Sequence, residues 1–336
     1  MKTGKILKNI GMSLVVPAVV YVFFFILCNV TGHSGFGVGA DLSTVVYSAI
    51  YAGLIALAMS MNLTSGRFDF SVGATLVLAG IAGGNFAYNQ GFGAFGLLVC
   101  VVVCGAVIGI VSGLAYVLLG LPPMVISLGM AMIYEAIGFN LNNSNGLRLM
   151  GKTNMLIYSK PPWSIVVLAA VIILISILWH NTRFGYERAA LAAGQKISND
   201  VGINEKKNAV ICYAVAGALL GTAACVYVSK YGLISASTGL SSSSYFMSAF
   251  LPMFLGGMIG RYSNHPIGIF LGALTQAFIT SGLTWLGCSS SAITVINGVI
   301  VMVFLIYTSN SYKLVEAKMF KEKLRQAKEA AAKNAA

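Results

Sequence analysis

Apolar runs of about twenty residues, separated by short polar segments, make up most of the chain. A run of this length crosses the hydrocarbon core of a bilayer as one α-helix, because a spanning segment must satisfy its own backbone hydrogen bonds. A transmembrane β-barrel would instead alternate polar and apolar residues over segments of about ten. The pattern predicts ten helical spans, of which the third and the eighth are short and rich in glycine. We place them near residues 10–30, 42–62, 71–87, 92–120, 124–140, 162–180, 209–228, 247–260, 264–287 and 292–310.

The composition supports the same fold class. Hydrophobic residues make up 57% of the chain and charged residues 9%, with a mean hydropathy of +0.84, whereas about 25% of the residues of a soluble domain are charged. The sequence therefore predicts an all-α integral membrane protein. Many of the 38 glycines lie four residues apart, a spacing that lets helix backbones approach closely. These sets are Gly80 and Gly84, Gly105 with Gly109 and Gly113, Gly217 and Gly221, Gly256 and Gly260, and Gly268 and Gly272.

The basic residues indicate the orientation. The chain has 21 Lys and Arg residues. If the N-terminus lies in the cytoplasm, all but four of these residues fall in cytoplasmic segments, and Arg67 is one of the cytoplasmic ones. The four outer ones are Arg148, Lys152, Lys160 and Lys230. Because Lys and Arg accumulate in cytoplasmic loops, we expect both termini in the cytoplasm and an even number of spans. The net charge of +12 therefore reflects topology and does not indicate a nucleic-acid partner. Trp163 and Trp179 lie at the two ends of the sixth span, as interfacial anchors do.

The sequence shows no chemistry typical of an enzyme or a metal site. The six cysteines are scattered over apolar segments, and no nucleophile–base pair or metal-ligand spacing is present, so we expect no catalytic residues and no metal. Residues 146–153, GLRLMGKT, match the phosphate-loop pattern letter for letter. That loop needs a preceding strand, a following helix and access to cytoplasmic nucleotide. Here an asparagine-rich stretch precedes the pattern, Pro161 and Pro162 follow it, and the topology places it outside, so we interpret it as a coincidence.

A polar interruption separates the second and third spans. Its polar residues are Thr64, Ser65, Asp69 and Ser71, with Gly66 between them. A broken backbone at this depth is tolerated only where it is buried in protein or lines a cavity. Asp69 or Ser71 capping the third helix accounts for the pattern at least as well as direct contact with a solute. We keep both roles as hypotheses.

Glu135 is the one acidic residue well inside a predicted span. Such a group is costly unless it faces a cavity or a partner. Two interpretations stay open, a carboxylate on the solute pathway and a helix-packing hydrogen bond. We include Glu135, and Asn140 at the end of the same span, among the candidate pathway residues.

The cytoplasmic loop over residues 181–208 is long for a connector. Its alanine-rich centre, 187–193, predicts a short helix ended by Gly194, and Gly202 closes a second one. A compact helical knob of this kind suits the docking of a peripheral subunit, and a solvated loop is the alternative. Residues 312–336 form a Lys- and Ala-rich cytoplasmic tail, for which we expect a solvated helix near anionic lipid.

Several segments resemble the permease subunits of bacterial ATP-binding-cassette importers for ribose, galactose and xylose. TSGRFDFSVG at 64–73 looks like their T-[SG]-G-x-D-L-S-V-G segment, and LPPMVISLGMAMI at 121–133 is similar to their P-P-F-x-x-T-L-G-M stretch. TRFG followed by GIN resembles their cytoplasmic loop, and LGGMIG, GIFLGAL and GLTWLG resemble their closing third. Two departures are Phe70, where the family has Leu, and Glu135, where the ribose-type proteins have Arg. The second departure leaves the solute open.

The resemblance implies one permease domain over residues 1–311, working with a second permease copy, identical or different. Two cytoplasmic ATPase subunits would bind ATP and Mg²⁺, so no cofactor is expected in this chain, and an extracytoplasmic binding protein would deliver a sugar-like solute. The residues implied in coupling to the ATPase are Glu187, Arg188, Gly194 and Gly202. The implied location is the bacterial cytoplasmic membrane. A nucleoside permease, a branched-chain amino-acid permease and an ATP-independent secondary transporter are the alternatives.

Overall fold

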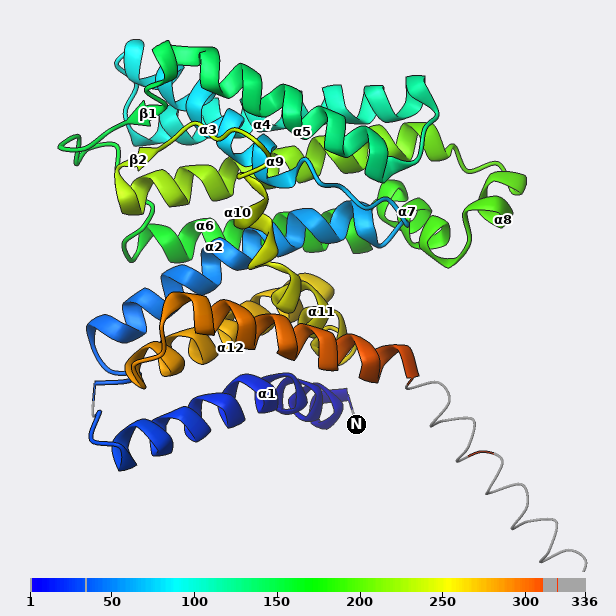
Figure 1. The fold of residues 1–336 in the computed structure, drawn as a ribbon. Coiled ribbons are helices and arrows are strands. Elements are labelled where there is room, and N and C mark those ends of the chain that lie inside the picture. Colours follow the sequence, from blue (N-terminus) through cyan, green and yellow to red (C-terminus); the bar gives the residue numbers. More distant parts are fainter. Residues whose placement is uncertain (1, 34, 311–318, 320–336) are drawn as a thin grey trace, which may run out of the picture. The chain divides into compact units, whose positions relative to one another are not determined.

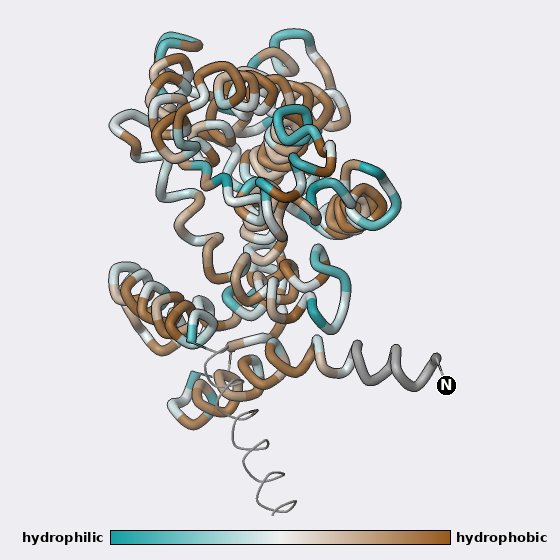
Figure 2. Tube along the Cα trace, turned by 90° about the vertical axis from the view of Figure 1, so that its right-hand side faces the viewer, coloured by the Kyte–Doolittle hydropathy of each residue, from teal (hydrophilic) through white to brown (hydrophobic). Residues whose placement is uncertain are grey.

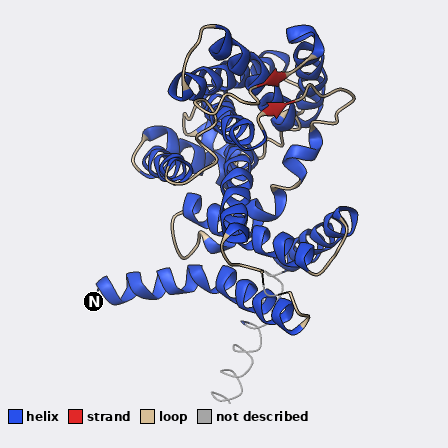
Figure 3. Ribbon diagram, turned by 90° about the vertical axis from the view of Figure 1, so that its left-hand side faces the viewer, coloured by secondary structure: helices blue, strands red, loops and turns tan. Residues whose placement is uncertain are grey.

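The computed structural model describes residues 2–33, 35–310 and 319. The chain falls into two compact units, 1–286 and 287–336. Helices dominate, and the only strands among the described residues are β1 (Leu147–Arg148) and β2 (Leu233–Ile234), which pair antiparallel (Figure 3). The predicted all-α fold class is confirmed. Apart from residue 319, the tail predicted over 312–336 lies outside the described residues, and the single domain predicted over 1–311 stays a prediction.

The helices of the first unit follow the predicted spans (Figure 1). They are α1 (Lys2–Val30), α2 (Ala40–Leu63), α3 (Val72–Asn89), α4 (Ala94–Leu119), α5 (Pro123–Asn140), α6 (Trp163–His180), α9 (Glu205–Tyr231), α10 (Ser243–Met247), α11 (Phe250–Ile259) and α12 (His265–Trp285). The cytoplasmic loop forms α7 (Arg183–Ala193) and α8 (Gln195–Asp200), and a 3-10 turn, η1 (Leu141–Ser144), follows α5. The second unit contains the helix Ser290–Asn310.

Within the described residues, eight helices are long and apolar enough to cross a membrane. The two predicted spans outside this set are the two that the sequence marks as short. One is α3, and the other is the eighth span, predicted over 247–260, where the structure has α11 preceded by the separate short helix α10. All ten predicted spans are therefore helical in the structure. In Figure 2 the hydrophobic colour runs along the helices and the hydrophilic colour gathers in the loops between them.

Glycines let α4 and α9 pack backbone against backbone. A methyl group on Gly105 would collide with the carbonyl oxygen of Gly217, and one on Gly217 would collide with that of Gly105. Helices α11 and α12 pack in the same way, because a methyl group on Gly268 would meet the carbonyl oxygen of Gly256. The four-residue glycine spacing predicted these close approaches correctly.

Replacing Gly217 by alanine is expected to destabilise the fold by about 1–3 kcal/mol, because the added methyl group overpacks the α4–α9 contact. Gly129 on α5 is the matched control, since a methyl group there meets nothing within 4 Å. Gly129→Ala should be neutral or stabilising by up to about 1 kcal/mol through helix propensity. Thermal unfolding in detergent, followed by size exclusion, measures both changes. Equal shifts for the two variants would contradict the close approach of α4 and α9.

Candidate functional site

The chain turns between α2 and α3 through residues 64–71, a segment called here the α2–α3 break. Gly66 has φ +76°, in the left-handed region that favours glycine. Asp69 Oδ1 accepts hydrogen bonds from the backbone N–H of Ser71 at 2.8 Å and from its hydroxyl at 2.7 Å. Burial raises the pKa of Asp69, and the two hydrogen bonds from Ser71 oppose that shift. Asp69 thus closes the turn before α3, whereas Ser71 at the N-cap position of α3 makes no side-chain capping bond, so both the capping role and a contact with solute stay predictions.

The cytoplasmic helices α7 and α8 pack onto the α2–α3 break. The guanidinium of Arg188 on α7 donates a hydrogen bond to Thr64 Oγ1, and Gln195 Nε2 on α8 donates to the carbonyl oxygen of Ser65 at 2.7 Å. Arg188 also lies over the ring of Trp179, with Cζ 4.2 Å from the ring centroid. Burial lowers the pKa of Arg188. Both cytoplasmic helices are therefore attached to the break by side chains.

Trp179, near the end of α6, is an interior residue. It is 6% exposed, its indole N–H donates to the sulfur of Met61 at 3.2 Å, and its ring centroid lies 5.1 Å from that of His265. The prediction that Trp179 anchors α6 at the membrane interface is therefore wrong, because its ring packs among α2, α7 and α12. Trp163, at the other end of α6, is about half exposed, as an anchor should be.

Local sequence determines where the two helices of the cytoplasmic knob, α7 and α8, begin and end. Thr182 Oγ1 accepts a backbone N–H of the first turn and begins α7, and Gly194 separates α7 from α8. Gly202 follows α8 with φ +90°. Both helix ends predicted at these glycines are confirmed. Glu187 is partly exposed and pairs with the exposed Arg183 at 2.7 Å.

Arg67 is fully buried beside this contact. Its guanidinium lies 3.8 Å from the carboxylate of Glu205, and among the described residues its nitrogens have no hydrogen-bond partner. The hydroxyl of Tyr116 donates to the same carboxylate at 3.1 Å. A buried charge is costly unless hydrogen bonds satisfy it. Arg67 lies beside the cytoplasmic helices, as its assignment to a cytoplasmic segment predicts, but its side chain is buried in the protein and not exposed in a solvated loop.

Aromatic rings join the α2–α3 break to α10 and α11. Phe68 and Phe70, both in the break, have ring centroids 4.7 Å apart. Phe68 lies 5.9 Å from Phe250 of α11, and Phe70 lies 6.0 Å from Phe246 of α10. The break is therefore in direct contact with α10 and α11.

Glu135 holds the backbone that leads into α10. Its side chain is buried, and its carboxylate accepts hydrogen bonds from the backbone N–H of Leu240 at 2.7 Å and of Ser242 at 2.9 Å. Leu240 has φ +63°, and the carbonyl oxygen of Ser242 lies so close to Gly73 of α3 that a methyl group there would collide with it. The packing interpretation of Glu135 thus has specific partners, and its place on a solute pathway stays a prediction.

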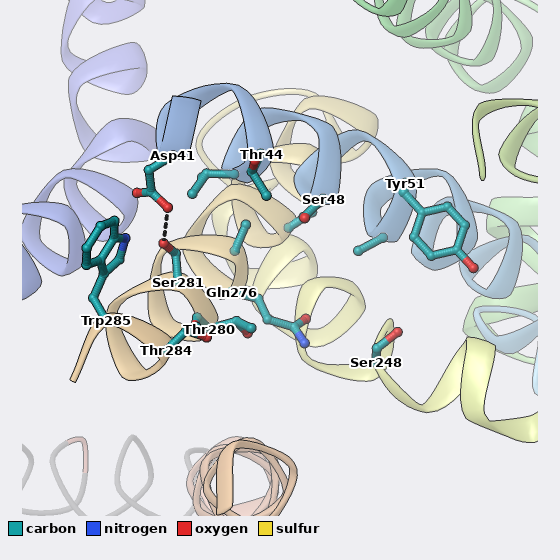
Figure 4. A pocket seen from close by; sticks show the side chains of 14 residues that line it. Asp41, Thr44, Ser48, Tyr51, Ser248, Gln276, Thr280, Ser281, Thr284 and Trp285 are labelled. Atoms are coloured by element: carbon teal, nitrogen blue, oxygen red, sulfur yellow. Dashed lines mark hydrogen bonds between the residues drawn. The ribbon is translucent and has the colours of Figure 1, made fainter. Parts of the chain in front are cut away.

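A cavity of about 310 Å³ lies between α2 and α12 (Figure 4). Polar side chains recur along both helices at the spacing of one helical face. They are Asp41, Thr44, Ser48 and Tyr51 on α2, and Gln276, Thr280, Ser281 and Thr284 on α12. At one end the hydroxyl of Ser281 donates to Asp41 Oδ1 at 2.7 Å, and Asp41 Oδ2 accepts from the backbone N–H of Gly37 at 2.7 Å. These bonds tie the two helices and the loop before α2 together beside the cavity.

Comparison with known proteins identifies the family. Residues 42–308 match the family described as the branched-chain amino acid transport system / permease component. The chain belongs to this permease family. It is 23% identical over 310 residues to the fructose import permease protein FruG of Bifidobacterium longum, which covers 87% of this chain and 90% of the relative. It is 25% identical over 277 residues to the ribose import permease protein RbsC of Escherichia coli, covering 78% and 83% of the two chains.

A further relative, the autoinducer 2 import system permease protein LsrD of Photorhabdus laumondii, is 25% identical over 275 residues, covering 78% of this chain and 81% of the relative. The resemblance drawn from sequence motifs is thus confirmed at the level of the family. This permease is a multi-pass protein of the bacterial cytoplasmic membrane, and its relatives are transport proteins, not enzymes.

The residues predicted for the solute pathway of the permease have different partners. Thr64 and Ser65 contact the cytoplasmic knob, Asp69 and Ser71 bond to each other, and Glu135 lies against the backbone before α10. Asn140 is exposed at the end of α5 and donates to a carbonyl of its own helix.

The phosphate-loop pattern of the permease lacks the structure that nucleotide binding requires. The short strand β1 lies within the pattern, and residues 149–162 after it form turns. The interpretation as a coincidence agrees with this geometry.

The residues predicted to couple the permease to its ATPase also have different surroundings from one another. Arg188 bonds to Thr64 in the α2–α3 break, Glu187 pairs with Arg183 on its own helix, and the two glycines follow the ends of α7 and α8. Our sequence interpretation missed Gln195, Arg67 and the polar face of the α2–α12 cavity. The signal for the cavity was available, because its polar residues recur at helical spacing within apolar helices.

Proposed function

We propose that this permease is the transmembrane subunit of an ATP-binding-cassette importer that moves a small, sugar-like solute into the cell, powered by a separate ATPase subunit. Its relatives are import permeases for fructose, ribose and autoinducer 2, and they match it over most of its length. The contact of α7 and α8 with the α2–α3 break supports a separate source of energy, because it links a cytoplasmic docking surface to the spans.

The contacts of the cytoplasmic knob suggest how movement would enter the membrane. Arg188 and Gln195 attach α7 and α8 to the break, so a subunit that displaces the knob also displaces residues 64–71. The break passes the displacement to α10 and α11 through Phe68 and Phe70. Packed side chains of this kind carry mechanical coupling between distant sites.

The proposed importer has other components. ATP and Mg²⁺ would be bound by the ATPase subunits, which dock on α7 and α8. A second permease copy, identical or different, would complete the membrane part, and a binding protein would deliver the solute from outside. Membrane lipid surrounds the bundle, where large apolar side chains such as Ile173 and Leu174 of α6 are exposed.

A branched-chain amino acid is the second candidate solute, because the family description names that transport system. A nucleoside is the third. An autonomous secondary transporter would need coupling ions instead of ATP. These alternatives differ from the proposal in the solute carried or in the energy source.

The test is uptake into proteoliposomes that contain the permease together with the ATPase and binding protein proposed as its partners. We expect ATP-dependent uptake of radiolabelled D-ribose or D-fructose, and none with an ATPase variant that cannot hydrolyse ATP. Uptake of leucine or adenosine in place of sugar would contradict the sugar assignment. Uptake that persists without ATP would contradict the importer class.

A further inference from the structure

We propose that the α2–α12 cavity is a binding subsite for a hydroxyl-rich solute of monosaccharide size. This inference rests on the proposed function and adds to it the residues that contact the solute within the membrane. The cavity volume of about 310 Å³ lies at the lower end of the range of small-molecule sites, which is roughly 300–1,000 Å³. Its size therefore favours a small solute.

Several polar groups around the cavity lack partners within the protein. Serine and threonine hydroxyls in helices usually donate to the carbonyl four residues earlier. Thr44 and Thr284 do so, whereas the hydroxyls of Ser48 and Thr280 make no hydrogen bond within the described part of the chain. In hydrocarbon surroundings a hydroxyl without a partner is costly. Both groups line the cavity, where a solute hydroxyl would supply the missing partner.

Gln276 strengthens the same conclusion. It is 7% exposed, it lines the cavity, and among the described residues its carbonyl oxygen has no hydrogen-bond partner. The terminal torsion of a glutamine side chain is soft, so the amide can turn this oxygen to the cavity at little cost. A buried acceptor without a donor is unfavourable by about 1–3 kcal/mol. A solute hydroxyl entering the cavity would donate to Gln276 and relieve this cost.

The remaining wall suits a sugar. Figure 4 shows the polar side chains of α2 facing those of α12 across the cavity, with Tyr51 near one end and Trp285 at the other. Val45, Ala273 and Ala277 supply apolar surface between them. A sugar presents both hydroxyls and C–H faces, so it matches a wall of this mixed character. Polar residues at membrane depth mark solute pathways in transport proteins.

Two pairs of variants test the subsite in the proteoliposome assay. Gln276→Leu should lower sugar uptake about 10-fold and Ser48→Ala about 3-fold, as expected for the loss of one hydrogen bond each. Thr275→Val and Ser43→Ala are the matched controls, because these side chains lie on the same helices, bond to their own helix and do not line the cavity. All four proteins should assemble with the ATPase. Uptake at the wild-type rate in both cavity variants would overturn the subsite.

A binding measurement separates this proposal from the proposed function. Ser48→Cys, in the assembled complex, should react with a hydrophilic methanethiosulfonate reagent above the wild-type background, and D-ribose or D-fructose should slow the reaction. Protection by leucine or adenosine but not by sugars would overturn the solute class. Disulfide formation between Cys residues of two copies would overturn the subsite, because the second copy would then cover it. Absence of sugar uptake in the wild-type complex contradicts the proposed function itself, whereas wild-type uptake with unaltered cavity variants contradicts the subsite alone.

Discussion

Replacing Arg188 by alanine is expected to lower sugar uptake by about 30-fold while the ATPase stays bound and continues to hydrolyse ATP. The variant loses a charged hydrogen bond to Thr64 and the stacking contact with Trp179. At the lower end of their usual ranges these contribute about 1.5 and 0.5 kcal/mol, and their sum of about 2 kcal/mol changes an equilibrium about 30-fold. Uptake and ATP hydrolysis are measured in the same proteoliposomes.

Arg183 provides the matched control, because it is an arginine of the same helix that is 91% exposed and, among the described residues, forms its ion pair with Glu187 alone. An exposed pair of this kind contributes about 0.3–0.5 kcal/mol, so Arg183→Ala should transport nearly as well as the wild type. Arg188→Lys keeps the charge but loses the planar group that stacks, and it should give intermediate uptake. Equal uptake by Arg183→Ala and Arg188→Ala would contradict the proposal that Arg188 transmits movement from the knob to the α2–α3 break.

The spans were predictable because the bilayer constrains each one separately. A run of about twenty apolar residues must be helical whatever its neighbours are, so α2 and α12 begin and end within two residues of their predicted limits. The short helix α10 before the eighth span was not predicted. The backbone that leads into α10 is held by a residue distant in sequence, because Glu135 on α5 accepts the N–H groups of Leu240 and Ser242.

The candidate site likewise combines contacts between neighbouring residues with contacts between residues that are distant in sequence. The bond between Asp69 and Ser71 joins residues two apart, so it is a local turn of the kind that Asp side chains form with the backbone. The inward position of Arg188 depends on Thr64, which is 124 residues away, and no local pattern distinguishes it from Glu187. The spacing of polar residues along α2 and along α12 indicates a polar face on each helix. The sequence does not show that the two faces line one cavity, because this depends on how the fold packs the two helices.

Replacing Glu135 by alanine is expected to lower uptake about 30-fold or more while assembly with the ATPase is kept. The change leaves the backbone N–H groups of Leu240 and Ser242 without their acceptor. Each buried donor without a partner costs about 1–3 kcal/mol, so the segment before α10 loses at least about 2 kcal/mol of its stabilisation. Uptake in proteoliposomes measures the transport effect, and limited proteolysis at residues 235–242 measures the loosening of the backbone.

Glu135→Gln distinguishes the two interpretations of this residue. Glutamine has nearly the same shape and keeps one acceptor oxygen, so it can hold one of the two N–H groups. If Glu135 acts by fixing the backbone, Glu135→Gln should fall between the wild type and Glu135→Ala in both uptake and proteolysis. If its charge contacts the solute, Glu135→Gln should transport as poorly as Glu135→Ala while resisting proteolysis better. Wild-type uptake by Glu135→Ala would contradict both interpretations, because the segment before α10 would then need neither the carboxylate nor its hydrogen bonds.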